Sequence, residues 1–211
     1  MKLYSGPISL FTAKVRVALA EKGLAYDRVE VGWSLERRYE PHHPDAVALS
    51  PKRQVPVLVD GDAVIYDSTV ILEYLEDRYP ERSLYPSQPV ERARCRQLEA
   101  AADEIVFESV WELIDAGFYP DARDPARLGA AQAKLAERHA WLDKQLAGGE
   151  YLCGEFSVAD VGMFIMVAAG ATLGAPPAGK LSNLARWMRA TGERDAVRED
   201  QTKMLSFVAT L

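Results

Sequence analysis

The chain has 211 residues, 48% of them hydrophobic and 27% charged, a composition typical of a soluble globular protein. Its 25 basic and 31 acidic residues give a formal net charge of -6, which lacks the basic surface that binds nucleic acids or anionic membranes. Two cysteines, Cys95 and Cys153, and three histidines form no pattern typical of a disulfide framework or a metal site. The length allows one large domain or two small ones.

The first eighty residues alternate between strand and helix patterns. In chain order they predict a strand over 2–4, a helix over 11–22, a strand over 26–31, an irregular connector over 35–49 broken by Pro41 and Pro44, strands over 55–59 and 64–66, and a helix over 69–79. The Asp60-Gly61 pair between the last two strands is a strong hairpin signal. This order predicts a small mixed sheet with a parallel βαβ half and an antiparallel hairpin half.

The rest of the chain has helical patterns. Prolines punctuate residues 81–88, which we interpret as a linker between a domain over 1–80 and an all-helical domain over 89–211. Helices are predicted over 90–115 and 125–146, and a last one around 184–188. Ser157 and Asp160 resemble a helix capping box at the start of an uncharged stretch.

The uncharged stretch over 161–179 is the one segment whose composition suggests a membrane span. Its glycines and prolines leave too few helical residues to cross a bilayer, so a buried core helix is predicted there. Gly6 and Pro7 interrupt the apolar residues near the N-terminus, so no signal peptide is expected. We therefore expect a cytoplasmic protein that binds neither membranes nor nucleic acids.

Ser9 lies between the first strand and the first helix, where two interpretations compete. A serine at this position commonly caps the helix, and on residue type alone that interpretation is the better one. The same position also suits a bound anion such as a thiolate, because a helix N-terminus offers free N–H groups and a partial positive charge. A serine hydroxyl there can donate one hydrogen bond to that anion.

Two further segments have both a structural and a functional interpretation. Gln54, Val55 and Pro56 open a strand, and Pro56 is either a plain strand start or a cis proline that leaves the Val55 backbone free to pair with an extended peptide. Asp67 and Ser68 precede the helix over 69–79 and are suited to capping it. Together they also suit the ammonium and carboxylate groups of an α-amino acid.

Four segments in register carry a resemblance to a known family. They are Tyr4-Ser-Gly-Pro-Ile-Ser9, Ser50-Pro-Lys-Arg-Gln-Val-Pro-Val-Leu58, Asp67-Ser-Thr-Val-Ile-Leu-Glu-Tyr-Leu75 and Ser157-Val-Ala-Asp160. In this order they resemble the glutathione S-transferase superfamily over nearly the whole chain. The resemblance implies an α/β thioredoxin-like N-terminal domain followed by an all-α helical-bundle domain.

The resemblance also implies the roles of individual residues. Gln54, Val55 and Pro56 would hold the cysteinyl backbone of glutathione, Asp67 and Ser68 its γ-glutamyl head, and Ser9, seven residues before Arg16, would face the thiol. A tyrosine-type site is not expected, because Ser5 stands at the matching position and Tyr4 points to the opposite face of the strand. A cysteine-type site is not expected either, because no cysteine stands at position 9.

Other contacts follow less directly from the resemblance. Basic residues of the connector and the loop after it, His43 and Arg53 among them, are candidates for binding the glycyl carboxylate of glutathione, and a solvated loop is the competing interpretation. Phe107, Trp111 and Phe118 are candidates for an apolar pocket that takes the second substrate, against the commoner role of such residues in a helical core.

The sequence therefore favours a homodimeric, Ser-type glutathione transferase. Glutathione would be its co-substrate, no metal would be bound, and the thiolate would attack a hydrophobic electrophile by conjugation, dehalogenation, ether cleavage or isomerisation, as in detoxification. The alternative is a non-catalytic member of the same fold that binds or regulates a partner protein.

Overall fold

The computed structural model describes residues 1–39, 42–119 and 124–211, which pack into two compact units. The first unit combines Met1–Leu84 with Asp195–Leu211, and the second is Tyr85–Arg194. Pro41, expected to break the connector, lies outside the described residues.

The first unit is built on a mixed sheet whose described strands are ordered β2-β1-β3-β4. These strands are β1 (Lys2–Ser5), β2 (Asp27–Glu30), β3 (Val57–Asp60) and β4 (Ala63–Tyr66). β1 pairs in parallel with β2 and antiparallel with β3, and β3 pairs antiparallel with β4. The predicted parallel half and hairpin half are therefore both confirmed.

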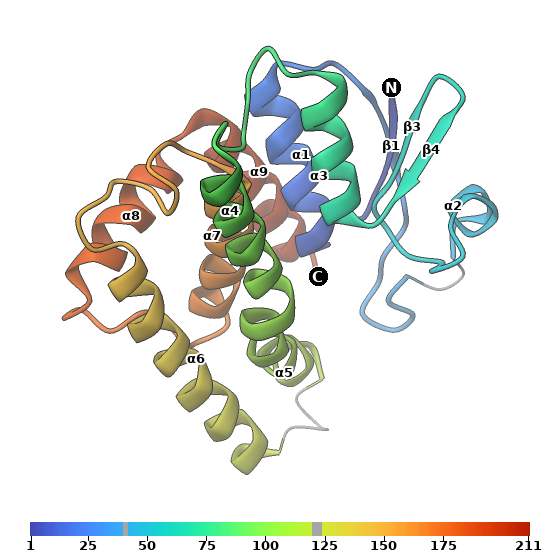
Figure 1. Ribbon diagram of the computed structural model, residues 1–211. Coiled ribbons are helices and arrows are strands. Elements are labelled where there is room, and N and C mark those ends of the chain that lie inside the picture. The colour runs from blue at the N-terminus through green and yellow to red at the C-terminus, as the bar shows by residue number, and fades with distance from the viewer. Residues whose placement is uncertain (40–41, 120–123) are drawn as a thin grey trace. The chain divides into compact units, whose positions relative to one another are not determined.

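Helices cover both faces of this sheet. On one face, α1 (Leu10–Lys22) and α3 (Ser68–Arg78) lie side by side (Figure 1) and bury a cluster made of Leu3, Val15, Leu19, Leu58, Ile71 and Leu75. On the other face, Tyr4 and Val57 pack with Ala46 of the short helix α2 (Pro44–Leu49). Adjacent strand residues such as Leu3 and Tyr4 thus serve opposite faces, as strand geometry requires.

Two segments of the first unit differ from the prediction. Residues 44–49, expected to be irregular, form α2, because Pro44 occupies the first helical position, where its missing N–H costs nothing. The described chain continues after the expected last helix with α9 (Asp195–Val208), which packs with the first unit. The domain boundaries drawn from the sequence, with residues 89–211 as one domain, stay a prediction. In the packing of the described residues, Asp195–Leu211 group with the first unit.

The second unit is helical throughout its described elements. A continuous run forms α4 (Pro89–Ala101), a π-helical segment η1 (Ala102–Val106) and α5 (Phe107–Phe118). It is followed by α6 (Pro125–Gln145), α7 (Val158–Thr172) and α8 (Ser182–Gly192). Because the helical pattern continues through residues 102–106, the sequence predicted a single helix over 90–115, and it gave no sign of the π-helical turns within it.

The apolar stretch that opens at Val158 forms the buried centre of this unit. Most residues of α7 are buried, and the helix packs against α4, α5 and α8. Ser157 and Asp160 form the predicted capping box, in which the Ser157 N–H donates to Asp160 Oδ2 at 3.0 Å. Within the described residues, no helix combines the length and apolar character needed to cross a membrane.

Candidate functional site

One end of the sheet brings together the three segments singled out in the sequence. The register pairs Tyr4 of β1 with Val57 of β3, and Val57 with Tyr66 of β4. The end of β1, the start of β3 and the end of β4 therefore meet at the same edge. Ser9 follows the first, Val55 precedes the second and Asp67 follows the third, so the strand pairing collects residues that lie far apart in the chain.

Ser9 is the N-cap of α1, as the structural interpretation predicted. Its backbone is extended, and its Oγ accepts a hydrogen bond from the Thr12 N–H at 3.2 Å. The hydroxyl proton can still be donated elsewhere, because the hydroxyl acts as an acceptor in this cap. The first turn of α1 contains no acidic residue, so no side chain of that turn offsets the partial positive charge of the helix N-terminus.

The Val55–Pro56 peptide bond is cis, which answers the isomer question that the sequence left open. Val55 is half-buried and lies just before the first paired residue of β3. Among the described residues, no backbone group pairs with its N–H or C=O. This short extended stretch is therefore available for pairing with an added peptide strand.

Asp67 caps α3 in a left-handed backbone conformation, with φ of 75°. Its Oδ1 accepts from the Thr69 N–H at 3.1 Å, and its Oδ2 forms an ion pair with Lys52. Partial burial favours the protonated form, but the hydrogen bond and charge of Lys52, together with backbone hydrogen bonds from Thr69 and Val70, outweigh it and lower the pKa of Asp67. Ser68 beside it is buried as the first residue of α3.

The two basic candidates for the glycyl carboxylate have different surroundings. His43 is half-buried, its ring meets the edge of Tyr4 at 5.4 Å, and its buried Nδ1 has no hydrogen-bond partner in the described part of the chain. Arg53 is exposed and adopts a positive φ of 55° in the loop before Gln54. Contact of either residue with a ligand stays a prediction.

The three aromatic candidates lie on α5 in the second unit. Phe107 and Trp111 are in ring contact at 6.0 Å, and Trp111 is 43% exposed. The buried residues of the helix, Ser109, Val110 and Leu113, lie on another part of its surface. The aromatic side chains are therefore not the main core residues of α5, and their role as substrate contacts stays a prediction.

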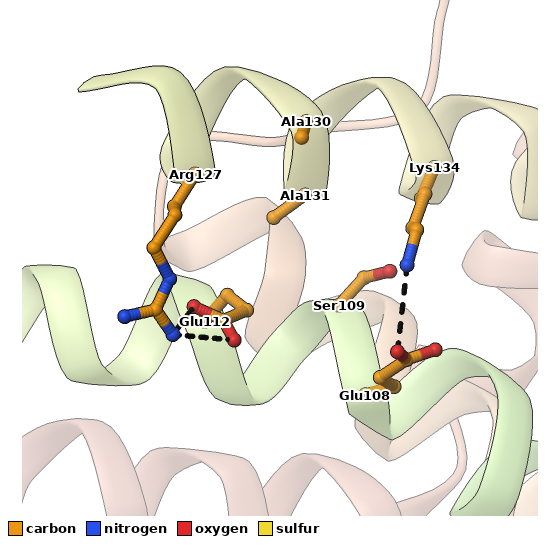
Figure 2. A pocket seen from close by; sticks show the side chains of 7 residues that line it. All are labelled: Glu108, Ser109, Glu112, Arg127, Ala130, Ala131 and Lys134. Carbon is orange, nitrogen blue, oxygen red and sulfur yellow. Dashed lines mark hydrogen bonds and ion pairs between the residues drawn. The ribbon is translucent and has the colours of Figure 1, made fainter. Parts of the chain in front are cut away.

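The second unit also has a small pocket of about 140 Å³, lined in part by charged residues, that was not predicted from the sequence. Figure 2 shows Arg127 of α6 reaching Glu112 of α5 and Lys134 reaching Glu108; the shortest N–O distances are 2.6 and 3.4 Å. The remaining lining residues are Ser109, Ala130 and Ala131. Its charged lining differs from that of the expected apolar pocket for an electrophile.

Sequence reasoning missed two residues of the first unit that support the segment before Ser9, one through Arg16 and one by direct contact. Asp200 of α9 pairs with the buried Arg16 of α1 across 184 residues of chain. Tyr39 packs against Gly6 in the turn that leads to Ser9. No local pattern could have indicated either contact, because both depend on how distant segments pack.

Comparisons with known proteins identify the family. The model of the glutathione S-transferase N-terminal domain matches residues 3–83. Glutathione S-transferase 3 from Zea mays is 30% identical over 185 residues, which cover 80% of this chain and 77% of that protein. The chain therefore belongs to the glutathione S-transferase family, and the predicted thioredoxin-like domain with a helical C-terminal region is confirmed.

Two bacterial relatives carry names other than glutathione S-transferase. A stringent starvation protein A homolog from Coxiella burnetii is 39% identical over 119 residues, which cover 56% of this chain and 53% of that protein. A maleylacetoacetate isomerase from Pseudomonas aeruginosa is 42% identical over 101 residues, which cover 47% of each protein. The match thus spans about half the length of these curated relatives.

Solved structures share the architecture. A glutathione S-transferase from Rhodospirillum rubrum superposes with a TM-score of 0.82 at 28% identity, covering 94% of this chain and 90% of that one. A sphingomonad glutathione S-transferase, solved in complex with glutathione, has a TM-score of 0.79 at 24% identity and covers 97% and 98%. At 24% identity the second likeness supports the fold alone.

Proposed function

We propose that the protein is a Ser-type glutathione transferase that binds glutathione at the sheet end containing Ser9, Val55 and Asp67. The observation that carries the proposal is the Val55 backbone, which pairs with no backbone group of the described residues and lies at the same end of the sheet as the N-termini of α1 and α3. A tripeptide thiol with a charged amino-acid head matches these groups. Its extended backbone would pair with Val55, and its head would meet Asp67 and Ser68.

The chemical task of such a site is to ionise the glutathione thiol. A thiol with a reference pKa of about 8.5 is only about 3% ionised at pH 7. Lowering that pKa by about 2 units requires about 2.7 kcal/mol of preferential stabilisation of the thiolate. A hydrogen bond from the Ser9 hydroxyl and the partial positive charge of the α1 N-terminus together can supply this amount.

Lys52 occupies the carboxylate that the γ-glutamyl head of glutathione would bind. In the free protein it neutralises Asp67, so the γ-glutamyl ammonium of glutathione would compete with Lys52 for the same carboxylate. The thiolate would then attack a hydrophobic electrophile, with Phe107, Trp111 and Phe118 as its apolar contacts. We propose further that the protein is a cytoplasmic homodimer, as the family resemblance implies.

Calorimetric titration with glutathione, combined with the shift in Tm at millimolar glutathione, tests the proposal. Binding should raise Tm, because a ligand that binds only the folded state stabilises it. Asp67→Asn should weaken binding at least tenfold, because it removes the charge that faces the ammonium. The matched control is Asp62→Asn in the exposed β3–β4 turn, which should bind like the wild type. If the wild type neither binds nor shifts its Tm, the proposal is wrong.

The stringent starvation protein relatives favour a second candidate function. A non-catalytic, regulatory member of the fold would bind a partner protein and would not need an ionised thiol. The two functions separate on the bound glutathione, because a transferase lowers the pKa of its thiol whereas a regulator need not. Ultraviolet absorbance of the thiolate, followed against pH in the complex, distinguishes them.

A further inference from the structure

The turn that leads to Ser9 is held by one guanidinium group. Nη1 of Arg16 donates to the Gly6 carbonyl oxygen at 3.0 Å and to Ser5 Oγ at 3.1 Å. The same Gly6 oxygen accepts the Ser9 N–H at a long 3.4 Å. Arg16 thus contacts the acceptor that closes the turn at Ser9, and its position affects where Ser9 lies.

Arg16 is in turn fixed by the last helix of the described chain. Its Nε and Nη2 donate to the two carboxylate oxygens of Asp200 in α9 at 2.5 and 3.0 Å. Both side chains are buried, with 4% and 9% of their surfaces exposed. A two-pronged contact of this kind fixes the plane of the guanidinium as well as its place.

Tyr39 also contacts this turn. A methyl group in place of the Gly6 hydrogen would lie 2.5 Å from Tyr39 Oη, so the phenol ring packs directly on this glycine. Burial raises the pKa of Tyr39 despite the opposing charge of Arg16, so the group is an uncharged phenol at neutral pH. The turn therefore contacts both the guanidinium of Arg16 and the ring of Tyr39.

We propose that Asp200 is a positioning residue for the thiolate site, acting through Arg16 and the Gly6 carbonyl on Ser9. The inference rests on the proposed glutathione-binding function. Asp200 does not contact the thiol itself; it fixes the orientation of Arg16, and Arg16 fixes the turn. The C-terminal helix of the first unit would thus set how well the α1 N-terminus and Ser9 stabilise the thiolate.

Asp200→Asn separates this role from a simple effect of charge. Removing a negative charge near the site would by itself favour the thiolate and lower the pKa of bound glutathione. Loss of positioning acts in the opposite direction, because Ser9 and the helix N-terminus would be misplaced. We expect the pKa of the bound thiol to rise by about 1 unit, equivalent to about a tenfold lower ratio of thiolate to thiol at a given pH. The Kd for glutathione at pH 7 should rise by only about threefold, the amount that the smaller thiolate fraction requires, because the Val55, Asp67 and Ser68 contacts remain.

Arg16→Lys is the second variant, because it keeps the charge but loses the two-pronged contact with Asp200. It should also raise the thiol pKa, and it decides the matter if Asp200→Asn does not fold. The matched control is Glu199→Gln on the same helix, whose exposed side chain pairs only loosely with Lys203 at 3.8 Å. This control should leave the thiol pKa unchanged.

The outcomes distinguish the inference from the function on which it rests. If the wild type binds no glutathione, the proposed function fails and the inference fails with it. If the wild type binds glutathione but the thiol pKa is unchanged or lower in the folded variants, only the positioning role of Asp200 is wrong. A raised pKa in both variants, with the control unchanged, supports the inference.

Discussion

The helices α1 and α7 both have a serine as their N-cap, and the two helix ends differ in how many hydrogen bonds close them. At the start of α7, the buried Asp160 accepts hydrogen bonds from Ser157, Leu152 and Trp187 at 2.8–3.0 Å. At the start of α1, the half-buried Ser9 makes a single cap bond to Thr12. A serine thus caps a helix N-terminus whose hydrogen bonds are satisfied by the protein in the second unit. In the first unit, a serine caps a helix N-terminus that is suited to binding an anion.

The largest expected effect is at the closed end. Asp160→Ala would leave the donors of Leu152, Trp187 and Ser157 without their acceptor in a buried setting, which should cost about 3 kcal/mol or more of unfolding free energy. Urea unfolding measures this loss. Asp195→Ala, which breaks an exposed ion pair with Arg198, is the control and should change stability by less than about 0.5 kcal/mol. A loss below about 1 kcal/mol at Asp160 would contradict the importance of this cap.

The second unit should also respond to acid through a buried histidine. Burial lowers the pKa of His139 from its reference of 6.5 to about 4, so the folded protein takes up this proton later than the unfolded chain. Above pH 6.5 this histidine is neutral in both states and does not affect stability. As the pH falls below 6.5, the unfolded chain binds the proton first, and the resulting loss of unfolding free energy reaches about 3 kcal/mol by pH 4. Unfolding free energies of the wild type and His139→Gln, measured across this range, should diverge in slope. Parallel curves would show that His139 does not titrate as inferred.

Replacing each cap serine by alanine tests the difference between the two helix ends directly. Ser9→Ala should cost only about 1 kcal/mol of stability but raise the pKa of bound glutathione by about 1–2 units. Ser157→Ala should cost about 1–2 kcal/mol and leave the thiol unaffected. Thermal unfolding and ultraviolet titration of the bound thiol measure both quantities. If Ser9→Ala leaves the thiol pKa unchanged, the backbone N–H groups of α1 carry the stabilisation.

The smallest effect is expected at the exposed pair between Lys52 and Asp67. Exposed pairs contribute at most about 1 kcal/mol, so Lys52→Met should tighten glutathione binding by no more than about fivefold. Because Lys52 lowers the pKa of Asp67, the variant should also lose glutathione at a higher pH during acidification. Lys180→Met, an exposed lysine of the second unit, is the control for calorimetry. A tenfold loss of affinity would show instead that Lys52 itself contacts glutathione.

Much of the first unit could be predicted because its signals are local. The hairpin around Asp60 and Gly61, the helix ending at Gly23 and the serine caps each depend on residues within a few positions of one another. The cis isomer of Pro56 and the pairing of Lys52 with Asp67 could not be predicted, because each depends on the folded surroundings. For the same reason, the sequence did not separate the π-helical turns of η1 from the helices around them.

The sequence by itself determined the order of the elements, the resemblance to the glutathione S-transferase family and the set of residues suited to glutathione. These follow from local periodicity, turn chemistry and motifs with fixed spacing. Only the tertiary structure decided that α9 packs with the first unit and that Asp200 holds Arg16 beside the turn to Ser9. A contact between residues 184 positions apart leaves no periodic trace in the chain, since it exists only once the strands and helices between them have packed.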